Sequence, residues 1–258
     1  MKDIQKTPDH REIDIQKVGI KGFHLPLSIV EKKGGEQPVL GEISLSADLT
    51  RDFKGSHLSR FVEILTPWSK KKLSSVELKK ILEDTMSGLN SKSAYIDVRF
   101  RYFVPKLSPV SRMESLLDYN CLFLASLDEK SYEFTLGVEV PVMNLCPCSK
   151  EISQFGAHNQ RGYIRVKIKY DADIIWIEDL VGIIEAQGSS PVYPLLKRQD
   201  EKFVTEASYE NPKFVEDVLR DTILALRNIA GIKWMEVECE DFESIHHHSA
   251  FAFQREHL

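Results

Sequence analysis

Residues 74–104 read SSVELKKILEDTMSGLNSKSAYIDVRFRYFV and hold a helix pattern followed directly by a strand pattern. Ser74 can cap the helix, and Glu77, three residues later, completes a capping box. An apolar stripe at helical spacing follows, made of Leu78, Ile81, Leu82, Thr85, Met86 and Leu89. From Tyr95 to Val104 apolar residues alternate with charged ones, which is typical of a strand with one buried face.

Similar patterns extend in both directions from this stretch. In the first half we predict strands at 18–30, 39–50, 95–104 and 116–127, with helices at 58–65 and from 75. In the second half we predict strands at 132–140, 164–170, 232–240 and 249–254, with helices at 177–187 and from 212. Asn211 is expected to cap the last helix, with Pro212 at its first position.

The order β-β-α-α-β-β therefore occurs twice, although the residues themselves do not repeat. We expect an α+β fold in which antiparallel sheets carry helices on one face. The predicted organisation is a flexible segment over residues 1–16, a first module over 17–128 and a second module over 129–258. The boundary between the modules is placed in the turn at 128–131.

Composition narrows the functional classes. Hydrophobic residues make up 42% of the 258 positions and charged residues 28%, which is normal for a globular chain with a sizeable core. The formal charge of -5 argues against a general nucleic-acid binder. The sequence shows no signal-peptide pattern and no apolar run of membrane-spanning length, so the expected location is cytoplasmic, away from membranes.

Four cysteines in a chain of this length do not suggest a disulfide framework. Cys121 and Cys239 lie in apolar or alternating stretches and are interpreted as packing residues. Cys146 and Cys148 stand in the connection NLCPCSKEISQFGAHNQRG, residues 144–162, with His158 downstream. Thiolate and imidazole groups suit a borderline-soft divalent ion such as zinc, although two incidental loop cysteines are the alternative.

A second connection, GSSPVYPLLKRQDEKFVTEASYENP at residues 188–212, is long for a structureless link in a compact domain. Lys197 and Arg198 could bind phosphates there, and Asp200 or Glu201 could supply an oxygen ligand. A solvated charge run is the alternative. Glu216 follows in the next helix, where a carboxylate that complements the helix dipole is the simpler interpretation.

A third connection, CEDFESIHHHSAFAF at residues 239–253, carries Glu243 and His246, which together could act as general acid and base. A histidine-rich surface turn is the alternative. In the first half, KGSHLSRFVE at residues 54–63 places His57, Ser59 and Arg60 where a helix opens, a position that favours anions. There the alternative is a simple cap beside a solvated arginine.

These motifs resemble the prokaryotic GTP cyclohydrolases of type IB. The resemblance rests on CPCSKEISQFGAHNQRG, LLKRQDEKFVTE, YENPKFVEDVLRD, ESIHHHSA and SHLSRFVE, and extends over about residues 54–253. One departure is His247, where the family pattern has a small polar residue. The resemblance implies a tunnelling fold with two β-β-α-α-β-β modules, and homotetramers with active sites at subunit interfaces.

The implied reaction converts GTP to 7,8-dihydroneopterin triphosphate and formate. A metal-activated water attacks C8 of guanine, and ring opening, loss of formate and pterin ring closure follow. The product would serve folate synthesis or queuosine-type tRNA modification. One divalent ion, zinc, manganese or iron, is implied in each active site.

Residue roles carry over from the same resemblance. Cys146, His158 and Glu201 would be metal ligands, while Cys148, Glu243 and His246 would be catalytic. Glu216 would bind the guanine edge. The other implied substrate-binding residues are Lys150, Arg161, Lys197, Arg198, His57, Ser59 and Arg60.

Two rival functions remain open at this point. A related tunnelling-fold nitrile reductase also uses a cysteine, but it requires a nicotinamide site and no catalytic metal. A binding module with a closed structural zinc site would need four protein ligands, which the chain could supply. A zinc-dependent base deaminase fits poorly, because it requires H-x-E followed by P-C-x-x-C.

Overall fold

The computed structural model describes residues 5, 7, 9–171 and 174–258. The expected flexible segment over residues 1–16 lies partly outside this described range, and the first strand, β1, begins at Ile15. The chain divides into two compact units, one of residues 1–101 and 122–136, the other of residues 102–121 and 137–258. Three strands contribute residues to both units: β4 (Ser93–Leu107), β5 (Glu114–Asp128) and β6 (Tyr132–Leu145).

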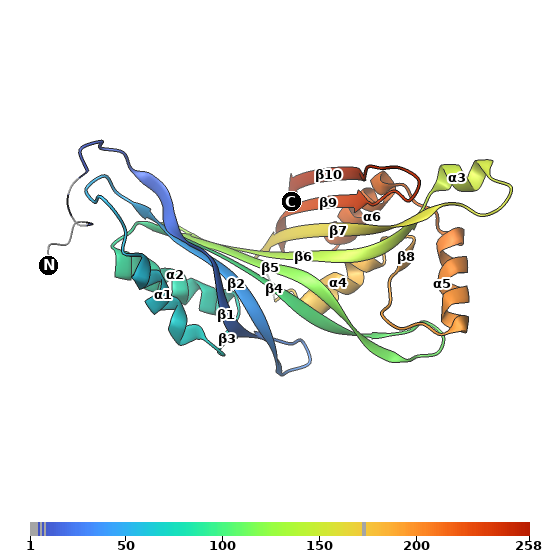
Figure 1. Ribbon diagram of the computed structural model, residues 1–258, viewed down its shortest axis with the longest axis horizontal. Coiled ribbons are helices and arrows are strands. Elements are labelled where there is room, and N and C mark those ends of the chain that lie inside the picture. The colour runs from blue at the N-terminus through green and yellow to red at the C-terminus, as the bar shows by residue number, and fades with distance from the viewer. Residues whose placement is uncertain (1–4, 6, 8, 172–173) are drawn as a thin grey trace. The chain divides into compact units, whose positions relative to one another are not determined.

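The first unit combines strands with two helices. Its further elements are β1 (Ile15–Val30), β2 (Glu36–Leu49), α1 (Leu58–Leu65), η1 (Thr66–Trp68), β3 (Lys72–Leu73) and α2 (Ser75–Leu89). The strand order is β5-β4-β2-β1-β3, with β1 antiparallel to β2 and parallel to β3. Helices α1 and α2 lie together beside these strands (Figure 1).

Helix α2 forms where its sequence predicts, but the expected capping box does not, because the Ser74 hydroxyl donates to the Glu77 carboxylate. Ser74 is the N-cap, and its hydroxyl oxygen accepts a hydrogen bond from the backbone N–H of Val76 at 3.2 Å. Four residues of the predicted stripe are buried: Leu78, Ile81, Leu82 and Thr85. Asn90 ends the helix in the left-handed conformation.

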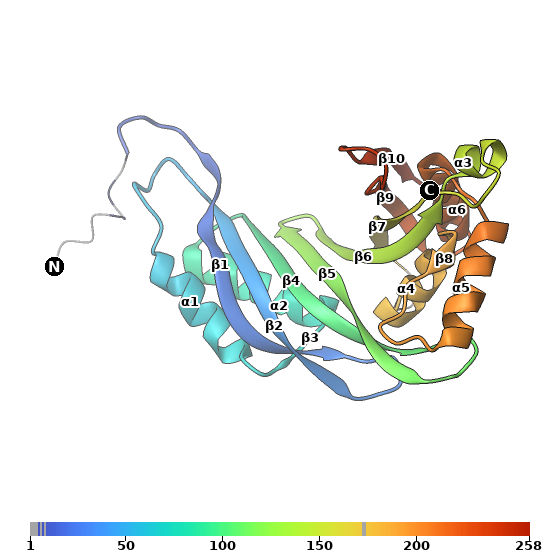
Figure 2. The ribbon, with the colours of Figure 1, turned by 45° about the vertical axis from the view of Figure 1, so that its right-hand side comes forward.

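The second unit carries the remaining elements. They are α3 (Pro147–Ile152), β7 (Asn159–Tyr170), α4 (Ile177–Glu185), β8 (Ser190–Pro191), α5 (Arg198–Glu210), α6 (Val215–Arg227), β9 (Ile232–Asp241) and β10 (Ala250–His257). The strand order is β10-β9-β7-β6-β5-β4, and β8 pairs with β6. Helix α6 packs along β9 and β10, with α4 beside it (Figures 1 and 2). The predicted α+β class is confirmed.

Two predictions in the second half are wrong. The connection expected over residues 188–212 contains helix α5, and Asn211 ends this helix instead of starting the next. The Asn211 side chain donates to the carbonyl oxygens of Gly188 and Ser189, at 3.2 and 3.3 Å. Helix α6 begins later, with Phe214 as N-cap, because the Asp217 carboxylate accepts the Phe214 backbone N–H at 3.1 Å.

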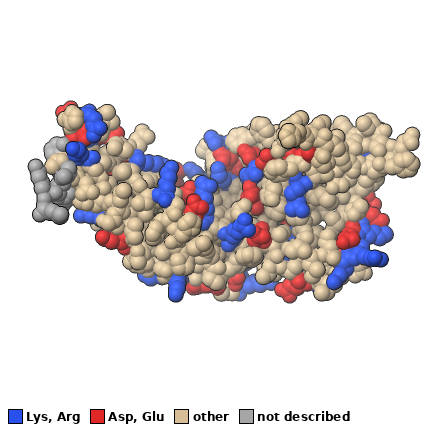
Figure 3. Space-filling view, in the orientation of Figure 1, with Lys and Arg blue, Asp and Glu red and all other residues tan. Residues whose placement is uncertain are grey.

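Charged side chains pair across the strands of the second unit. Arg165 of β7 donates to Glu139 of β6 at 2.6 Å, and to Glu238 and Glu240 of β9 at 2.9 and 2.8 Å. Acidic and basic side chains are interspersed in this way over the face shown in Figure 3. Among the described helices, none has the length and apolar character needed to cross a membrane.

Candidate active site

The connection after β6 folds into a closed loop that brings Cys146 and His158 together. Cys146 is the N-cap of α3, and its backbone N–H donates to the carbonyl oxygen of His158 at 3.1 Å. The Ser149 hydroxyl accepts the His158 backbone N–H at 3.1 Å, and the Ser149 N–H lies 3.5 Å from the Cys146 sulfur. Cys148, in the first turn of α3, is exposed. Both sulfur groups are thus held at one end of a six-residue helix.

The His158 ring joins this loop to the connection between β9 and β10. Its Nδ1 atom lies 3.0 Å from Oε1 of Gln160 and 3.8 Å from Oε2 of Glu243. The side chains of His158 and Glu243 are mostly buried, at 15% and 17% exposure. Imidazole and carboxylate groups are the side chains that often act as general base and general acid in enzymes.

The buried carboxylate of Asp241, at the end of β9, is linked to His158 through the Gln160 side chain. It accepts a hydrogen bond from Asn144 Nδ2 at 2.6 Å and another from the Gln160 side chain. Burial raises the pKa of Asp241 to about 6; these hydrogen bonds lower it in part, while the negative charges of Glu243 and Glu216 raise it. The site therefore gathers three carboxylates: Asp241 at the end of β9, Glu243 in the connection that follows it, and Glu216 in α6.

The raised pKa of Asp241 has a consequence for stability. A carboxyl that binds its proton more tightly when folded stabilises the fold below its ordinary pKa, and this stabilisation is lost as pH rises through the folded value. We expect metal-free protein to lose about 1 kcal/mol between about pH 5 and about pH 7, relative to Asp241→Asn. Urea unfolding of both proteins at the two pH values measures the difference. A difference that stays constant with pH would contradict the raised pKa.

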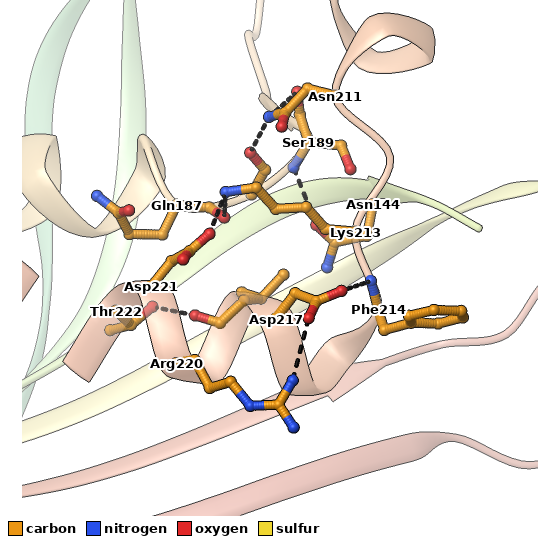
Figure 4. A network of polar contacts seen from close by, with 12 residues as sticks. Asn144, Gln187, Ser189, Asn211, Lys213, Phe214, Asp217, Arg220, Asp221 and Thr222 are labelled. Carbon is orange, nitrogen blue, oxygen red and sulfur yellow. Dashed lines mark hydrogen bonds and ion pairs between the residues drawn. The ribbon is translucent and has the colours of Figure 1, made fainter. Parts of the chain in front are cut away.

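Helix α6 is fixed at its start by a polar network that links it to the end of β6 (Figure 4). The Lys213 backbone N–H donates to the Leu145 carbonyl oxygen at 3.1 Å. The Lys213 ammonium donates to the Gln187 carbonyl oxygen at 2.8 Å and to Asp221 at 2.7 Å. Glu216 projects from the first turn of the helix fixed in this way, and its side chain is exposed.

Helix α5 is held by Asp200, whose side chain is fully buried. The carboxylate accepts the backbone N–H groups of Val110, Ser111 and Lys197, each at 2.8 Å, and the Ser111 hydroxyl at 2.6 Å. Although burial acts to raise it, the pKa of Asp200 lies far below its ordinary value because these groups donate to the charged form. Asp200 is therefore structural, and its neighbour Glu201 is exposed.

We expect Asp200→Ala to lower the melting temperature by several degrees, because four donors lose their acceptor and two elements lose their link. Glu201→Ala is the matched control, since it removes an exposed carboxylate from the next position in the same helical turn. Its melting temperature should equal that of the unsubstituted protein when both are metal-free. Equal melting temperatures for the two variants would contradict the anchoring role of Asp200.

The predicted metal ligands are only partly assembled. Cys146 and His158 are linked through the backbone, whereas Glu201 lies exposed on α5. Over the described ranges, no group of three or more His, Cys, Asp or Glu side chains is arranged to hold a metal ion. The backbone hydrogen bond brings the residues Cys146 and His158 together, and the ligand set itself remains a prediction.

The residues expected to bind the triphosphate occupy different surroundings. Lys150 donates to the Tyr209 carbonyl oxygen at 2.5 Å and lies 4.3 Å from the centre of that ring, so it ties α3 to the end of α5. The side chains of Lys197, Arg198 and Arg161 are exposed. The backbone of Arg161 accepts the Phe242 N–H at 2.9 Å, which binds two of the three connections together.

In the first unit, His57 is the N-cap of α1, Ser59 is exposed and Arg60 donates to the Gly88 carbonyl oxygen at 2.7 Å. This agrees with the expected helix opening. In the second unit, the exposed rings of His246 and His248 stack with centres 5.1 Å apart. These two rings are therefore accessible from solvent.

Three polar residues of the site were not singled out from the sequence: Asn144, Gln160 and Asp241. Their side chains are buried. Hydrogen bonds between them link the loop that carries Cys146 and His158 to the loop that carries Glu243. The sequence does indicate that Asp241 is buried, because this residue lies on the same face of β9 as the buried residues Val237 and Cys239. A charged residue on an apolar strand face is informative because buried charges are rare.

The sequence matches a family model described as type I GTP cyclohydrolase folE2 over residues 1–252. Proteins named GTP cyclohydrolase FolE2 from Geobacter sp. (strain M21) and Thermosipho africanus (strain TCF52B) are 49% and 45% identical to it over 252 residues. Each alignment covers 98% of this chain, and 93% and 96% of the respective relative.

The buried Cys121 and Cys239 agree with their interpretation as packing residues.

Solved structures with little sequence identity to this chain have a similar fold. The uricase from Arthrobacter globiformis superposes with a TM-score of 0.58 at 5% identity, covering 94% of this chain and 93% of that one. A mutant urate oxidase from Bacillus sp. TB-90 gives 0.57 at 8% identity, covering 95% and 100%. At such identities the likeness concerns the fold alone, and it confirms the predicted tunnelling fold.

Proposed function

The chain belongs to the folE2 family of type I GTP cyclohydrolases, and from this we propose that it converts GTP to 7,8-dihydroneopterin triphosphate and formate. The structural observation that best supports this is the meeting of two connections at His158. There a thiol-bearing loop and a carboxylate, Glu243, lie beside one imidazole. Opening a purine ring and closing a pterin ring both require groups that transfer protons at neutral pH.

In this proposal each side chain has a distinct task. Glu216 accepts two N–H hydrogen bonds from the guanine edge, because a carboxylate can accept both side by side. Glu243 and His246 move protons during ring opening and closure. The Cys148 thiol, exposed beside Cys146, lies close to C8 of the bound purine. Exposed Lys197, Arg198 and Arg161 are available to the triphosphate.

We further propose that Cys146, His158 and Glu201 hold one divalent ion. Thiolate, imidazole and carboxylate donors suit zinc, manganese or iron. A bound ion supplies Lewis acidity that makes water nucleophilic near pH 7. Glu201 is exposed on α5, so its carboxylate is accessible to an ion.

Elemental analysis of purified variants tests the ligand set. We expect Cys146→Ala and Glu201→Gln each to bind less than one ion per chain, because a three-ligand site loses much of its affinity with one ligand. Lys202→Gln, which changes the next exposed residue of α5, is the control and should retain the ion. Full metal content in Cys146→Ala would remove that residue from the set.

The reaction itself is tested by incubating metal-replete protein with GTP. Formate and a pterin that becomes fluorescent after oxidation are expected, and a chelator should abolish both. Release of inorganic phosphate without formate would identify a different GTP-consuming activity and overturn the proposal. Turnover of a nitrile with NADPH would favour the related reductase instead.

We also propose a cytoplasmic homotetramer with active sites at subunit interfaces. β10 is the last strand in the order of the second unit, and its Phe251 and Phe253 are 71% and 46% exposed. An edge strand with exposed aromatic side chains favours pairing with another chain. The exposed thiol of Cys148 suits a reducing compartment. Light scattering of the purified protein tests the tetramer, which a monomeric mass would exclude.

A further inference from the structure

A line of buried side-chain hydrogen bonds runs from the backbone of Ser189 to the ring of His158. The Ser189 N–H donates to Oδ1 of Asn144 at 3.1 Å, and Nδ2 of Asn144 donates to Oδ1 of Asp241 at 2.6 Å. The Gln160 side chain also donates to Asp241, and Oε1 of Gln160 lies 3.0 Å from Nδ1 of His158. Asn144, Gln160 and Asp241 are 1%, 7% and 2% exposed, so water competes little for these groups.

The direction of every donor in this line is fixed by groups that cannot reverse. A backbone N–H only donates, so Asn144 must turn its oxygen to Ser189 and its NH2 group to Asp241. An ionised carboxylate only accepts, so Gln160 must turn its NH2 group to Asp241 and its oxygen to His158. The ring nitrogen that faces Gln160 must then carry a proton.

We propose that Asp241 and Gln160 are positioning residues that hold neutral His158 in its Nδ1–H tautomer and leave the lone pair on Nε2. A neutral imidazole with one nitrogen fixed as a donor can use the other to bind an ion or accept a proton. That use of Nε2 rests on the proposed function, whereas the tautomer does not. Glu243, at 3.8 Å from Nδ1, favours the same proton position from beyond hydrogen-bond distance.

Nitrogen-15 NMR of the His158 ring tests the tautomer directly. The sample is full-length protein without metal or substrate, at a mildly alkaline pH where Asp241 is ionised. A protonated Nδ1 and an unprotonated Nε2 are expected, and the opposite assignment would overturn the proposal. In Asp241→Asn the side chain keeps one acceptor, which Asn144 requires, and presents an NH2 group to Gln160. The Gln160 amide should then reverse, and the proton of His158 should shift to Nε2.

Two further variants separate Gln160 from Glu243. In Glu243→Gln the Nδ1–H tautomer should persist, because the hydrogen bond to Gln160 is intact. Gln160→Leu removes that hydrogen bond and should give a mixture of tautomers. If Asp241→Asn does not fold, Gln160→Leu serves as the test of the proposed tautomer. An unchanged tautomer in the folded Asp241→Asn or Gln160→Leu protein would assign the effect to Glu243 and sink the proposal.

Zinc affinity distinguishes failure of this proposal from failure of the proposed metal site. With Cys146, His158 and Glu201 intact, Asp241→Asn should weaken zinc binding about 10- to 100-fold, as found when partners of a ligating histidine are removed. A shifted tautomer with unchanged zinc affinity would uphold the positioning role and count against His158 as a ligand. Absence of GTP turnover in the unsubstituted protein would count against the proposed function alone.

Discussion

Replacing Cys148 with alanine is expected to reduce GTP turnover by at least about 100-fold, the usual scale for losing a group that transfers protons or attacks substrate. The thiol is exposed in the first turn of α3, so its removal opens no cavity in the core. Cys146 and the backbone hydrogen bonds that close the loop to His158 are unaffected. The variant should therefore fold, keep its metal content and still bind GTP.

The measurement combines formate release with melting temperature and metal content. Cys121→Ala is the matched control, because it removes a thiol that is buried in β5 away from the loop. This control should melt at a lower temperature but retain its turnover number below the transition. Full formate release by folded Cys148→Ala would exclude the thiol from the reaction.

Local periodicity is sufficient to predict most of the sheet and the helices α1, α2 and α4. The strands β4 and β9 follow from alternation within about ten residues, and α1 has the predicted bounds. Because each of these elements buries one face, its apolar residues recur in the sequence at the period of a strand or a helix. Strand ends were underestimated by a few residues because pairing continues past the last apolar position.

Helix α5 could not be predicted in this way because its buried face is slight. Phe203 and Tyr209 are 48% and 39% exposed, and only Asp200 and Ser208 are buried in this helix. Its position depends on the bonds of Asp200 to residues 110 and 111, about ninety positions earlier in the chain. A contact of that separation leaves no periodic signal near the helix.

The residues of the site also divide into those that the sequence indicates and those that only the fold brings together. The sequence indicates Cys146, His158 and Glu243 because their side chains are chemically reactive. The structure brings His158 and Glu243 within 3.8 Å of each other. Asp241 did not, because its closeness to Gln160 depends on the pairing of β7 with β9, where Gly162 lies opposite Asp241. A side chain at Gly162 would collide with this carboxylate, so the glycine makes room for it. Only the pairing of the strands shows that relation.

A second large effect is expected from Glu216→Gln. In the proposed complex the carboxylate accepts N1–H and the 2-amino group of guanine, each a charge-assisted bond of about 1.5–3 kcal/mol. Glutamine keeps one acceptor and turns an NH2 group toward the second donor. We expect kcat/KM for GTP to fall at least about 100-fold, with little change in stability because the side chain is exposed.

Inosine triphosphate separates recognition of guanine from any other role of Glu216, because it lacks the 2-amino group. The preference for GTP over this analogue should decrease in Glu216→Gln, since the lost bond involves the group that distinguishes the two substrates. Glu206→Gln, an exposed change on α5 that affects only the pair with Lys202, is the control and should retain both values. If Glu216→Gln kept the full preference for GTP, the guanine edge would have to be bound elsewhere. Its position at the fixed start of α6 would then serve the charge balance around Asp241 alone.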